Sequence, residues 1–422
     1  MNIIICLLSV VLCAEVPALS SSEVAGNFSE LGVDSVFKES PSDDPKHYNV
    51  EPGEYEAKLS KLVWMIPGPG SLPEEVVAQR SNNNVAIEFF ERRIFMAFRT
   101  GRIHFANSKT RMYVISSADG VNWDMEWVSP TGRDAREPQL VSYNGKLNFY
   151  YFTAGTSPFK FEPSEVFHVT RNAFRSWTVP ERVMEKGEVH WEMKVRNGQI
   201  WMTSYSGTHY RLGGGPARIK LHLKTSIDGK NFLNVDKARE AVSIGGVSEA
   251  GFELDEEGNL WSVTRNEDGD ESGFGSHMAF APSNRLSYWT MNSVPDGYQS
   301  PRMFRHGKDI YLIARRQKSN GPYGWAQRGG YAWRRIMNLA HYALTAKTTA
   351  LYRMRQETMR LEHVIDLPGA GDTAFPSIRR VDAHTYLVAN YTSSLKKKNK
   401  KWFIGQLGKT QIYLITVKFS KK

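Results

Sequence analysis

Arginine and carboxylate side chains recur at the ends of short apolar segments throughout this 422-residue chain. A guanidinium is a planar fork that can hold a carboxylate through two parallel hydrogen bonds. Several arginines at one place would repel one another unless an anion or carboxylates offset their charge. The set therefore predicts an anionic ligand. Its members are Arg99, Arg136, Arg265, Arg302 and Arg315.

Carboxylates alternate with these arginines, and two interpretations of them stay open. They can neutralise the arginines in buried ion pairs. Alternatively, a carboxylate or a phenol can act as acid, base or nucleophile in cleavage of a glycosidic bond, which usually requires a flanking pair of such groups. The acidic residues are Asp134, Glu137, Glu192, Glu249 and Asp372, and the aromatic residues in the same pattern are Trp191, Phe375 and Tyr391.

These residues can meet only if the segments that carry them converge, and a sixfold repeat indicates how they do so. Each copy is an apolar run, a polar or glycine turn, and a second run rich in aromatic and β-branched residues, which is typical of a β-hairpin. A strand-based repeat of about 50 residues is typical of stacked β-sheet blades. The second runs begin at Ile94, Leu147, Ile200, Leu260, Ile310 and Tyr386.

A second repeated turn lies between the hairpins. The segments that end at Trp123 and Phe232 share the pattern Ser-x-Asp-Gly-x-x-aromatic, and looser relatives begin at Arg171 and Ser283. We expect the Asp side chain to accept backbone N–H bonds, the Gly to adopt a positive φ, and the aromatic ring to pack between sheets. These turns are interpreted as structural staples.

Together the two repeats predict an all-β fold, a six-bladed β-propeller of four-stranded antiparallel blades over residues 61–422. Both kinds of turn then lie on one face of the propeller. The starts of the first strands and the ends of the second strands lie on the opposite face, beside the central axis. This topology predicts that the arginines and carboxylates converge there.

The N-terminal segment predicts secretion. Residues 1–18 contain the short apolar stretch and small residues of a signal peptide, and both cysteines, Cys6 and Cys13, lie within it. Residues 19–60 are rich in Ser, Glu, Asp, Gly and Pro and predict a flexible acidic leader. The sequons at Asn27 and Asn390 predict N-glycosylation.

Charge is distributed unevenly. Residues 1–60 carry ten acids and three lysines, whereas the whole chain has a net charge of +10, so the remainder is strongly basic. A basic secreted surface favours acidic glycans or an anionic extracellular matrix over nucleic acid, for which no binding module is recognisable. The basic run Lys396 to Lys401 is interpreted as a solvated loop, or as a glycan or mineral contact.

Other classes of partner are not indicated. Histidine and cysteine spacing predicts no metal site, and glycine runs such as Gly213 to Gly215 lack the context of a phosphate or cofactor site. No second apolar segment approaches the length of a membrane span. A closed ring of blades leaves no obvious free sheet edge, so a monomer is expected.

The chain resembles the sialidase (neuraminidase) superfamily of six-bladed propellers over roughly residues 80–419. The resemblance is carried by the Asp-Gly turns, by AFRT, DAREPQL and EAGFELDEEGNLWSVTRN, and by GDTAFP followed by LVANYTS. It implies three arginines that hold a sugar carboxylate: Arg99, Arg265 with the preceding Glu249, and either Arg302 or Arg315. With Arg136, Glu137 and Trp191, these form the predicted substrate-binding set.

The chain also departs from that family. The loop TGRIHFANSKTR has no aspartate to serve as acid or base, and Phe375 and Tyr391 stand where the last hairpin of a sialidase has its Tyr and Glu. The Asp-Gly turns are one residue shorter than the family's usual form. Tyr391 is then the candidate nucleophile, with Glu249 or Asp372 as its base.

Two functions follow as hypotheses. The first is a secreted sialidase-like propeller that binds acidic glycans through axial arginines and hydrolyses them as an exo-glycosidase, or only binds them. The second is a non-catalytic extracellular or biomineral-associated matrix protein built on the same fold. A five-bladed glycosidase of the arabinanase type is disfavoured, because the sequence contains six hairpins.

Overall fold

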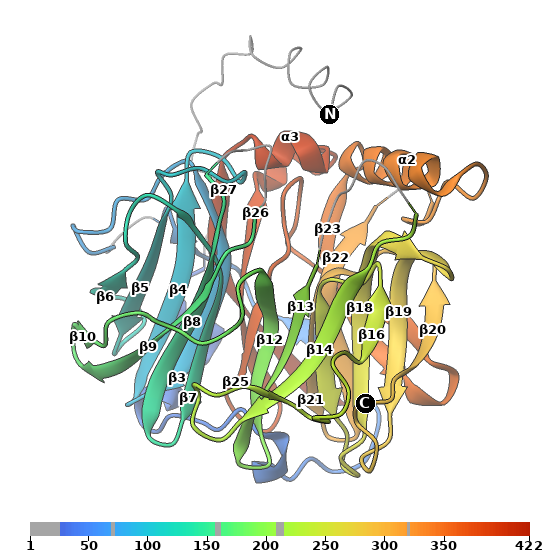
Figure 1. Ribbon diagram of the computed structural model, residues 1–422. Helices are drawn as coiled ribbons and strands as arrows, with labels where there is room; N and C mark the ends of the chain where they lie inside the picture. The colour runs from blue at the N-terminus through green and yellow to red at the C-terminus, as the bar shows by residue number, and fades with distance from the viewer. Residues whose placement is uncertain (1–25, 69–71, 157–161, 208–214, 319–320) are drawn as a thin grey trace.

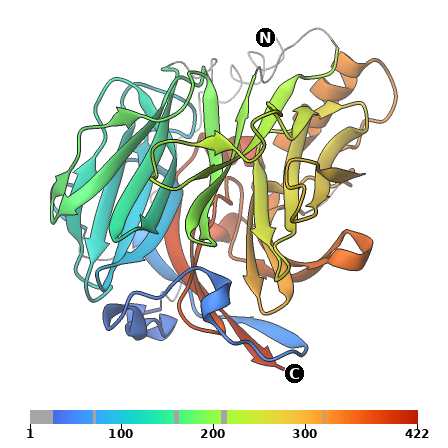
Figure 2. The ribbon, with the colours of Figure 1, turned by 60° about the horizontal axis from the view of Figure 1, so that its bottom comes forward.

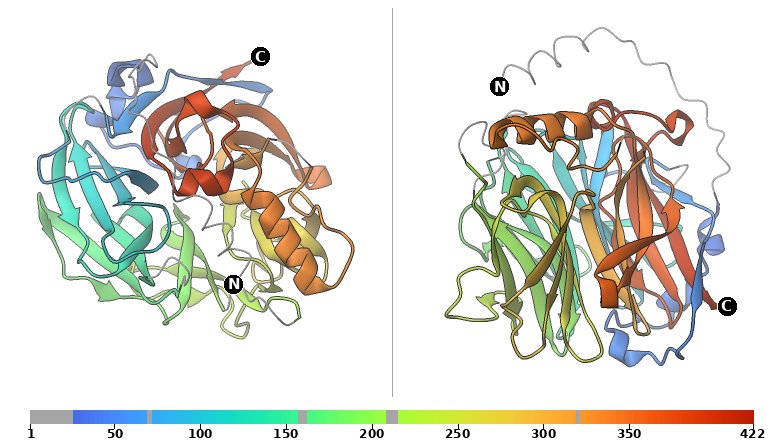
Figure 3. Two further views of the ribbon diagram at one scale, coloured as in Figure 1. Left: turned by 90° about the horizontal axis from the view of Figure 1, so that it is seen from above. Right: turned by 90° about the vertical axis from the view of Figure 1, so that its right-hand side faces the viewer.

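A computed structural model describes residues 26–68, 72–156, 162–207, 215–318 and 321–422. The predicted signal peptide and both cysteines lie outside these residues. Antiparallel sheets dominate the fold and stand around a common axis, and two helices lie on the upper face in the view of Figure 1. The same arrangement is seen from above in Figure 3.

The largest sheet has nine strands and contains the first and the last strand of the described chain. It consists of two antiparallel groups joined through one parallel pair, Ser81 with Thr410. Its first group is β3 Ser81–Phe90, β4 Arg93–Gly101, β5 Arg111–Ser117 and β6 Asp124–Val128. Its second group is β25 Ser377–Arg380, β26 Thr385–Ser393 and β27 Thr410–Lys421, with β1 Tyr55–Leu59 and β2 Val63–Ile66 paired to β27.

Four further sheets each run through consecutive strands. The second sheet is β7 Asp134–Tyr143, β8 Lys146–Ala154, β9 Val166–Ala173, β10 Ser176–Trp177 and β11 Glu181–Arg182. The third is β12 Glu188–Arg196, β13 Gln199–Ser206, β14 Ile219–Ser226, β15 Leu233–Asn234 and β16 Ser243–Gly245. The fourth is β17 Ala250–Leu254, β18 Leu260–Asp270, β19 Gly273–Ala281 and β20 Thr290–Val294. The fifth is β21 Gln299–His306, β22 Asp309–Gln317, β23 Lys347–Arg355 and β24 Arg360–Leu367.

All six predicted hairpins are confirmed as antiparallel pairs, β3–β4, β7–β8, β12–β13, β17–β18, β21–β22 and β25–β26. The last strand, β27, also pairs with β2 near the start of the described chain. These predictions succeed because alternating side chains and turn residues are properties of neighbouring positions in the chain.

The Asp-Gly turns have the predicted geometry. Asp119 Oδ1 accepts the backbone N–H groups of Val121 and Asn122 at 2.8 and 2.7 Å, and Gly120 has a φ of 74°. Asp228 repeats these bonds in the second copy, where Gly229 has a φ of 77°. These bonds stabilise the ionised carboxylate, and they lower the pKa of Asp119 to about 2 against the opposing effect of partial burial.

Apolar clusters fill the spaces between neighbouring sheets, and one of them separates the two groups of the nine-stranded sheet. That cluster packs Ile87 and Met96 of the first group against Leu387 and Ile412 of the second. The two groups therefore face each other across a core, as separate sheets do. Burial of this apolar surface holds the sheets around the axis.

Residues 26–60 do not form the flexible leader that the sequence predicts. Leu31, Val33 and Val36 are buried in the core cluster, and Phe28 packs on Gly120, where an added Cβ would lie 2.1 Å from its ring. The segment includes the 3₁₀ helices η1 Phe28–Leu31, η2 Asp34–Phe37 and η3 Pro45–His47. Figure 2 shows it in blue across the lower face. The four apolar residues are separated by polar ones, so composition alone did not reveal their burial.

Replacing Leu31 by Ala is expected to lower the free energy of unfolding by about 2–5 kcal/mol, because the side chain is 2% exposed. Urea unfolding of the purified chain measures this change. The control is Ser35→Ala on the next 3₁₀ turn, whose side chain is exposed. A flexible leader would give both variants the stability of the unaltered chain.

Helices are few and were not anticipated. They are α2 Tyr331–Ala343, which follows β22, and α3 Trp402–Gln406, which follows β26, together with the 3₁₀ helices η4 Gln356–Thr358 and η5 Leu395–Lys397. None of the helices formed by the described residues has the length and apolar character needed to cross a bilayer. Both α-helices lie on the upper face (Figure 1).

Candidate functional site

The innermost strands carry bulges at matching positions near their upper ends. The register shifts between Asn83 and Val85 in β3, between Arg136 and Gln139 in β7, and between Gln299 and Arg302 in β21. The bulged residues Asn84, Glu137 and Ser300 have φ values of 45°, 51° and 52°. A positive φ is unfavourable for residues other than glycine and is commonly found where a side chain is re-aimed at a functional site.

Hydrogen bonds link these bulges from strand to strand. Asn84 donates its side-chain amide to Glu137 Oε2 at 3.0 Å. The carbonyl oxygen of Glu137 lies 2.6 Å from His190 Nε2 in β12. The backbone N–H of Ser300 donates to Glu249 Oε2 at 2.8 Å. The starts of the first strands therefore converge beside the axis, as the topology predicts.

Trp191 packs across this convergence. Its indole N–H donates to the carbonyl oxygen of Pro301 at 3.0 Å, and its ring lies 5.0 Å from the ring of Phe375 at an angle of 74°. The guanidinium of Arg302 sits 4.6 Å from the Trp191 ring and 5.0 Å from the Phe375 ring. Trp191 is 1% exposed, so in this structure it is an internal packing residue and does not offer a face to a ligand.

Two of the predicted arginines share one buried carboxylate. Asp134 accepts the Nε–H of Arg99 at 2.7 Å and the Nε–H of Arg136 at 2.6 Å. Asn83 and the carbonyl oxygens of Phe105 and His104 accept further N–H groups of the two guanidiniums. The ion-pair interpretation of the sequence therefore describes these arginines.

Arg265 is paired on both sides. Its two terminal nitrogens form ion pairs with Glu249 and with Glu267. Glu249 thus has Arg265 on one oxygen and the Ser300 N–H on the other. Both oxygens of the Glu249 carboxylate are therefore engaged within the protein.

Arg302 and Arg315 have no carboxylate within ion-pair distance among the described residues. Arg302 donates to the carbonyl oxygen of Trp191 at 2.6 Å. Arg315 donates to the carbonyl oxygens of Thr373 and Ala374 and, at 3.1 Å, to the hydroxyl of Tyr342. These two guanidiniums are buried positive charges that protein carboxylates do not directly neutralise. Of the predicted arginines, these two are the ones whose positive charge would attract an anionic ligand.

The surroundings of Glu137 move the pKa of its carboxyl group close to neutral pH. Burial and the nearby charge of Glu249 raise its pKa to about 7, although Arg136, Arg302 and the amide of Asn84 oppose the shift. The side chain is half-buried rather than enclosed. Near neutral pH this carboxyl group can therefore gain or lose a proton at a site that solvent reaches.

Tyr391 and Asp372 form a separate pair. The Tyr391 hydroxyl donates to Asp372 Oδ1 at 3.2 Å, and Asp372 Oδ2 lies 2.7 Å from His104 Nδ1. Burial and the Asp372 charge raise the pKa of Tyr391 well above its ordinary value. The pKa of Asp372 is lowered, because His104 and Arg315 outweigh the effect of burial. Proton transfer from this phenol to this carboxylate is consequently unfavourable in the free protein.

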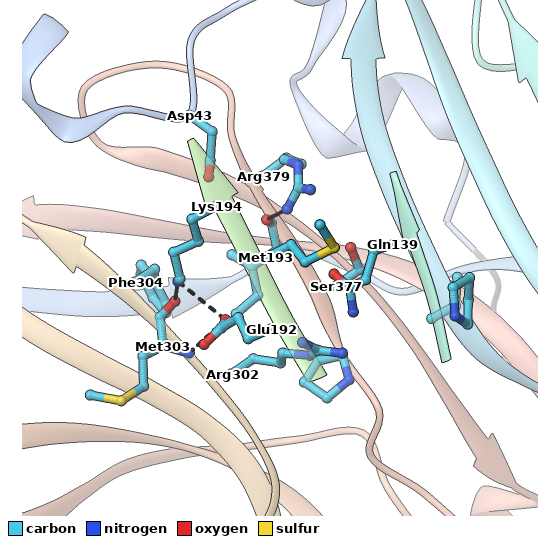
Figure 4. Close-up of a pocket in the computed structure, with 14 residues that line it drawn as sticks. Asp43, Gln139, Glu192, Met193, Lys194, Arg302, Met303, Phe304, Ser377 and Arg379 are labelled. Atoms are coloured by element: carbon cyan, nitrogen blue, oxygen red, sulfur yellow. Dashed lines mark hydrogen bonds and ion pairs between the residues drawn. The ribbon is translucent and has the colours of Figure 1, made fainter. Parts of the chain in front are cut away.

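A small cavity lies on the axis below the site. It measures ≈ 30 Å³, and Glu192, Lys194, Arg302 and Arg379 contribute to its walls (Figure 4). Glu192 and Lys194 form an ion pair of 3.1 Å, which Figure 4 marks with a dashed line. Pockets for small ligands usually enclose roughly 300–1,000 Å³. This cavity is therefore an internal void. Glu137, Arg265 and His104 are each half-buried, and we call the partly exposed surface that they form the upper opening.

The remaining predicted residues are placed as follows. Asn27 is exposed, whereas Asn390 is fully buried in β26 and donates its amide to Thr349 and Tyr413. A glycan on Asn390 would thus require this part of the sheet to open. No group of three His, Cys, Asp or Glu side chains within the described ranges is arranged to hold a metal ion.

Sequence reasoning missed three participants. His104 was considered only for metal spacing. Glu267 pairs with Arg265, two residues before it in β18, and no motif marked this pairing. Asn84 contacts Glu137, which is 53 residues away on another sheet. Tyr205 in β13 is buried, and burial, followed by the charges of Glu249 and Glu137, raises its pKa well above its ordinary value. The only signal that could have identified Asn84 is its own position, as a polar residue near the start of a predicted strand.

No family model matches the chain, and no curated protein matches it. Solved structures with a similar fold exist. A protein of unknown function from Dyadobacter fermentans DSM 18053 is 14% identical with a TM-score of 0.53, over 83% of this chain and all of that one. The endosialidase of phage phi92 is 10% identical with a TM-score of 0.54, over 88% of this chain and 70% of that one.

A sialidase of Trypanosoma rangeli is 13% identical with a TM-score of 0.52. The match covers 87% of this chain and 60% of the sialidase, so the chain spans less than two thirds of that protein. At these identities the similarity shows a shared fold, that of a sialidase-like β-propeller, and carries no activity or substrate with it.

Proposed function

We propose that the chain is a secreted, sialidase-like β-propeller that binds acidic glycans at the upper end of its axis and hydrolyses them. In this proposal the propeller has six blades, and the two groups of the nine-stranded sheet count as separate blades. The apolar cluster between those groups supports this count, as do the six hairpins. The similarity of fold to sialidases supports the architecture alone.

The observation that carries the proposal is the contrast between Glu137 and Glu249. The Glu137 carboxyl group has a pKa raised to about 7, while Glu249 is ion-paired to Arg265 and accepts the Ser300 N–H. Two acidic groups in different environments are what cleavage of a glycosidic bond requires. Glu137 would donate the proton to the leaving oxygen, and the Glu249 carboxylate would attack the sugar or activate a water.

The preference for acidic glycans rests on Arg302 and Arg315. Their charges lack carboxylate partners among the described residues, so a sugar carboxylate near the opening would be attracted to them. Arg99, Arg136 and Arg265 are occupied by Asp134, Glu249 and Glu267. They would hold the site rigid rather than bind the substrate directly.

Tyr391 and Asp372 remain the alternative nucleophile and base within the same proposal. Their hydrogen bond supports the pairing, whereas the raised pKa of the phenol and the lowered pKa of the carboxyl group oppose it. The two assignments predict loss of activity in different variants, so one experiment that compares these variants separates them.

Hydrolysis of a fluorogenic sialoside and of matched uronic and neutral glycosides tests the proposal. We expect activity on an acidic substrate that falls at least about 100-fold in Glu249→Gln and little in Tyr391→Phe. Glu357→Gln, on an exposed 3₁₀ turn, is the matched control. If Tyr391→Phe alone abolishes activity, the alternative pair is correct.

The second candidate function is a non-catalytic extracellular matrix protein. The enclosed axis and the complete burial of Tyr391 and Asp372 favour it. Under this hypothesis, no glycoside in the panel is cleaved, and the protein is retained on an anionic matrix through its basic surface. Turnover of any substrate that requires Glu249 would exclude it.

A further inference from the structure

Two segments on the upper face carry many cations and no acid. Residues 318–346, around α2, contain Lys318, Arg328, Arg334 and Arg335. Residues 394–409, around α3, contain Lys396, Lys397, Lys398, Lys400, Lys401 and Lys409. Neither segment contains an aspartate or a glutamate. We call the described parts of these two segments the basic cap.

The two segments of the basic cap are in contact. The backbone N–H of Trp402 donates to the carbonyl oxygen of Thr345 at 3.1 Å, and an isolated β-bridge joins Ala346 to Lys401. The rings of Tyr342 and Trp402 lie 5.1 Å apart. Figure 3 shows α2 and α3 side by side from above. The cations therefore belong to one surface.

Several cations of the basic cap are exposed and unneutralised. Arg328, Lys397, Lys398 and Lys401 are exposed, and none of them forms an ion pair with a carboxylate in the part of the chain that the structure describes. Some exposed lysines elsewhere have such partners, such as Lys58 with Glu56, Lys230 with Glu181 and Lys421 with Glu51, whereas others, such as Lys109 and Lys146, have none among the described residues. What distinguishes the cap is that its exposed cations are grouped on two segments that contain no acidic residue, so their positive fields add.

Large aromatic faces lie among these charges. Trp333 of α2 is 56% exposed, and Trp325 is 50% exposed and stacks on His341 with ring centres 5.1 Å apart. Exposed tryptophans grouped with cations mark an interaction surface. Their rigid flat faces suit sugar rings, and the apolar side chains lie on separate elements rather than along the single stripe that enters a membrane.

The basic cap also forms the roof of the candidate site. The Arg315 guanidinium lies 5.4 Å from the Trp402 ring, and the backbone N–H of His104 donates to the carbonyl oxygen of Gln406 at 3.0 Å. Gly405 packs on the backbone of Asp372 so closely that an added Cβ would lie 2.1 Å from its nitrogen. A chain bound on the cap would thus be led toward the opening beside Glu137.

We propose that the basic cap is a binding surface for a polyanionic polysaccharide, a sulfated or uronic-acid chain, distinct from the axial site. The chain lies along the exposed lysines and packs sugar rings on Trp333. Its binding needs neither Glu137 nor Glu249 and does not depend on hydrolysis. The proposal therefore goes beyond the proposed function. Binding on the cap and hydrolysis at the axial site can each be disproved without affecting the other.

Heparin is the probe, and its binding to the full chain is measured across NaCl concentrations. The cap variant K397Q/K398Q/K401Q is compared with K58Q/K230Q/K421Q, which removes the same charge elsewhere. We expect the cap variant to bind about tenfold more weakly and to lose roughly 2–3 from the slope of log affinity against log salt. The control is expected to change less than about twofold. Thermal unfolding verifies that both fold.

Two further variants distinguish the alternatives. Trp333→Ala should weaken heparin binding without changing the salt slope, and Glu249→Gln should bind as the unaltered chain does. Equal binding by the two triple variants would overturn the proposal, because only net charge would then matter. Loss of binding in Glu249→Gln would place heparin at the axis. Tighter binding to phosphatidylserine vesicles than to heparin would identify a lipid surface instead.

Discussion

Replacing Glu137 by Gln is expected to lower kcat/KM for an acidic glycoside by about 100- to 10,000-fold, the usual contribution of a positioned acid. Glutamine keeps the size of the side chain and its contact with Asn84, but it has no proton to give the leaving oxygen. The loss should be smaller for an aryl glycoside, whose leaving group needs little protonation. Kinetics with an aryl glycoside and a natural disaccharide measure the difference.

The pH profile gives a second readout. An acid must be protonated to act, and the pKa of Glu137 is raised to about 7, so activity should be full below that pH and fall as the pH rises through it. Glu137→Gln should lack this alkaline limb. Glu267→Gln, which removes another carboxylate of the same cluster, is the control and should keep it. An alkaline limb that persists in Glu137→Gln would assign the proton to another group.

Replacing Trp191 by Ala is expected to lower the free energy of unfolding by about 3–5 kcal/mol, as for other fully buried large aromatic residues. The indole fills the space between β12, β21 and the segment before β25, and its removal would also leave the Arg302 guanidinium without one of its two aromatic faces. A cavity on the axis cannot collapse easily, because several sheets surround it.

Urea unfolding measures this effect, with Trp191→Phe as the partner variant. Phe keeps a ring beside Phe375 but cannot donate to the Pro301 carbonyl, so it should cost less than Ala. A loss below about 1 kcal/mol for Trp191→Ala would contradict its packing role. It would also reopen the sequence-based assignment of Trp191 to the substrate-binding set.

The sequence could predict which residues of the site lie close together. The turn pattern placed Arg99 at the end of β4 and Glu249 before β17 on the axial side, and the hydrogen bonds that join Glu137, Glu249 and neighbouring strands agree with this. What those residues do to one another could not be predicted. Arg99 and Arg136 share Asp134, while Arg302 and Arg315 are left without a carboxylate among the described residues.

The packing of residues 26–60 also depends on tertiary contacts that the sequence does not reveal. Phe28 and Val36 occur among acidic and small residues, so the segment has the composition of a disordered leader. It is held because a gap beside β3, β4 and β27 accepts those side chains, and Gly120 allows Phe28 to approach. The gap exists only once the sheets have assembled.

The sequence by itself determined the hairpins, the Asp-Gly turns and the face on which the charged residues gather. These features depend on side-chain alternation and turn chemistry among residues that are neighbours in the chain. Only the tertiary structure decided the bulges at Asn84, Glu137 and Ser300, the partner of each arginine and the protonation of Glu137. The protonation of Glu137 arises from burial and from charges on other sheets. The arginine partners include near neighbours, Asp134 for Arg136 and Glu267 for Arg265, but their pairing depends on side-chain orientations that no local pattern encodes.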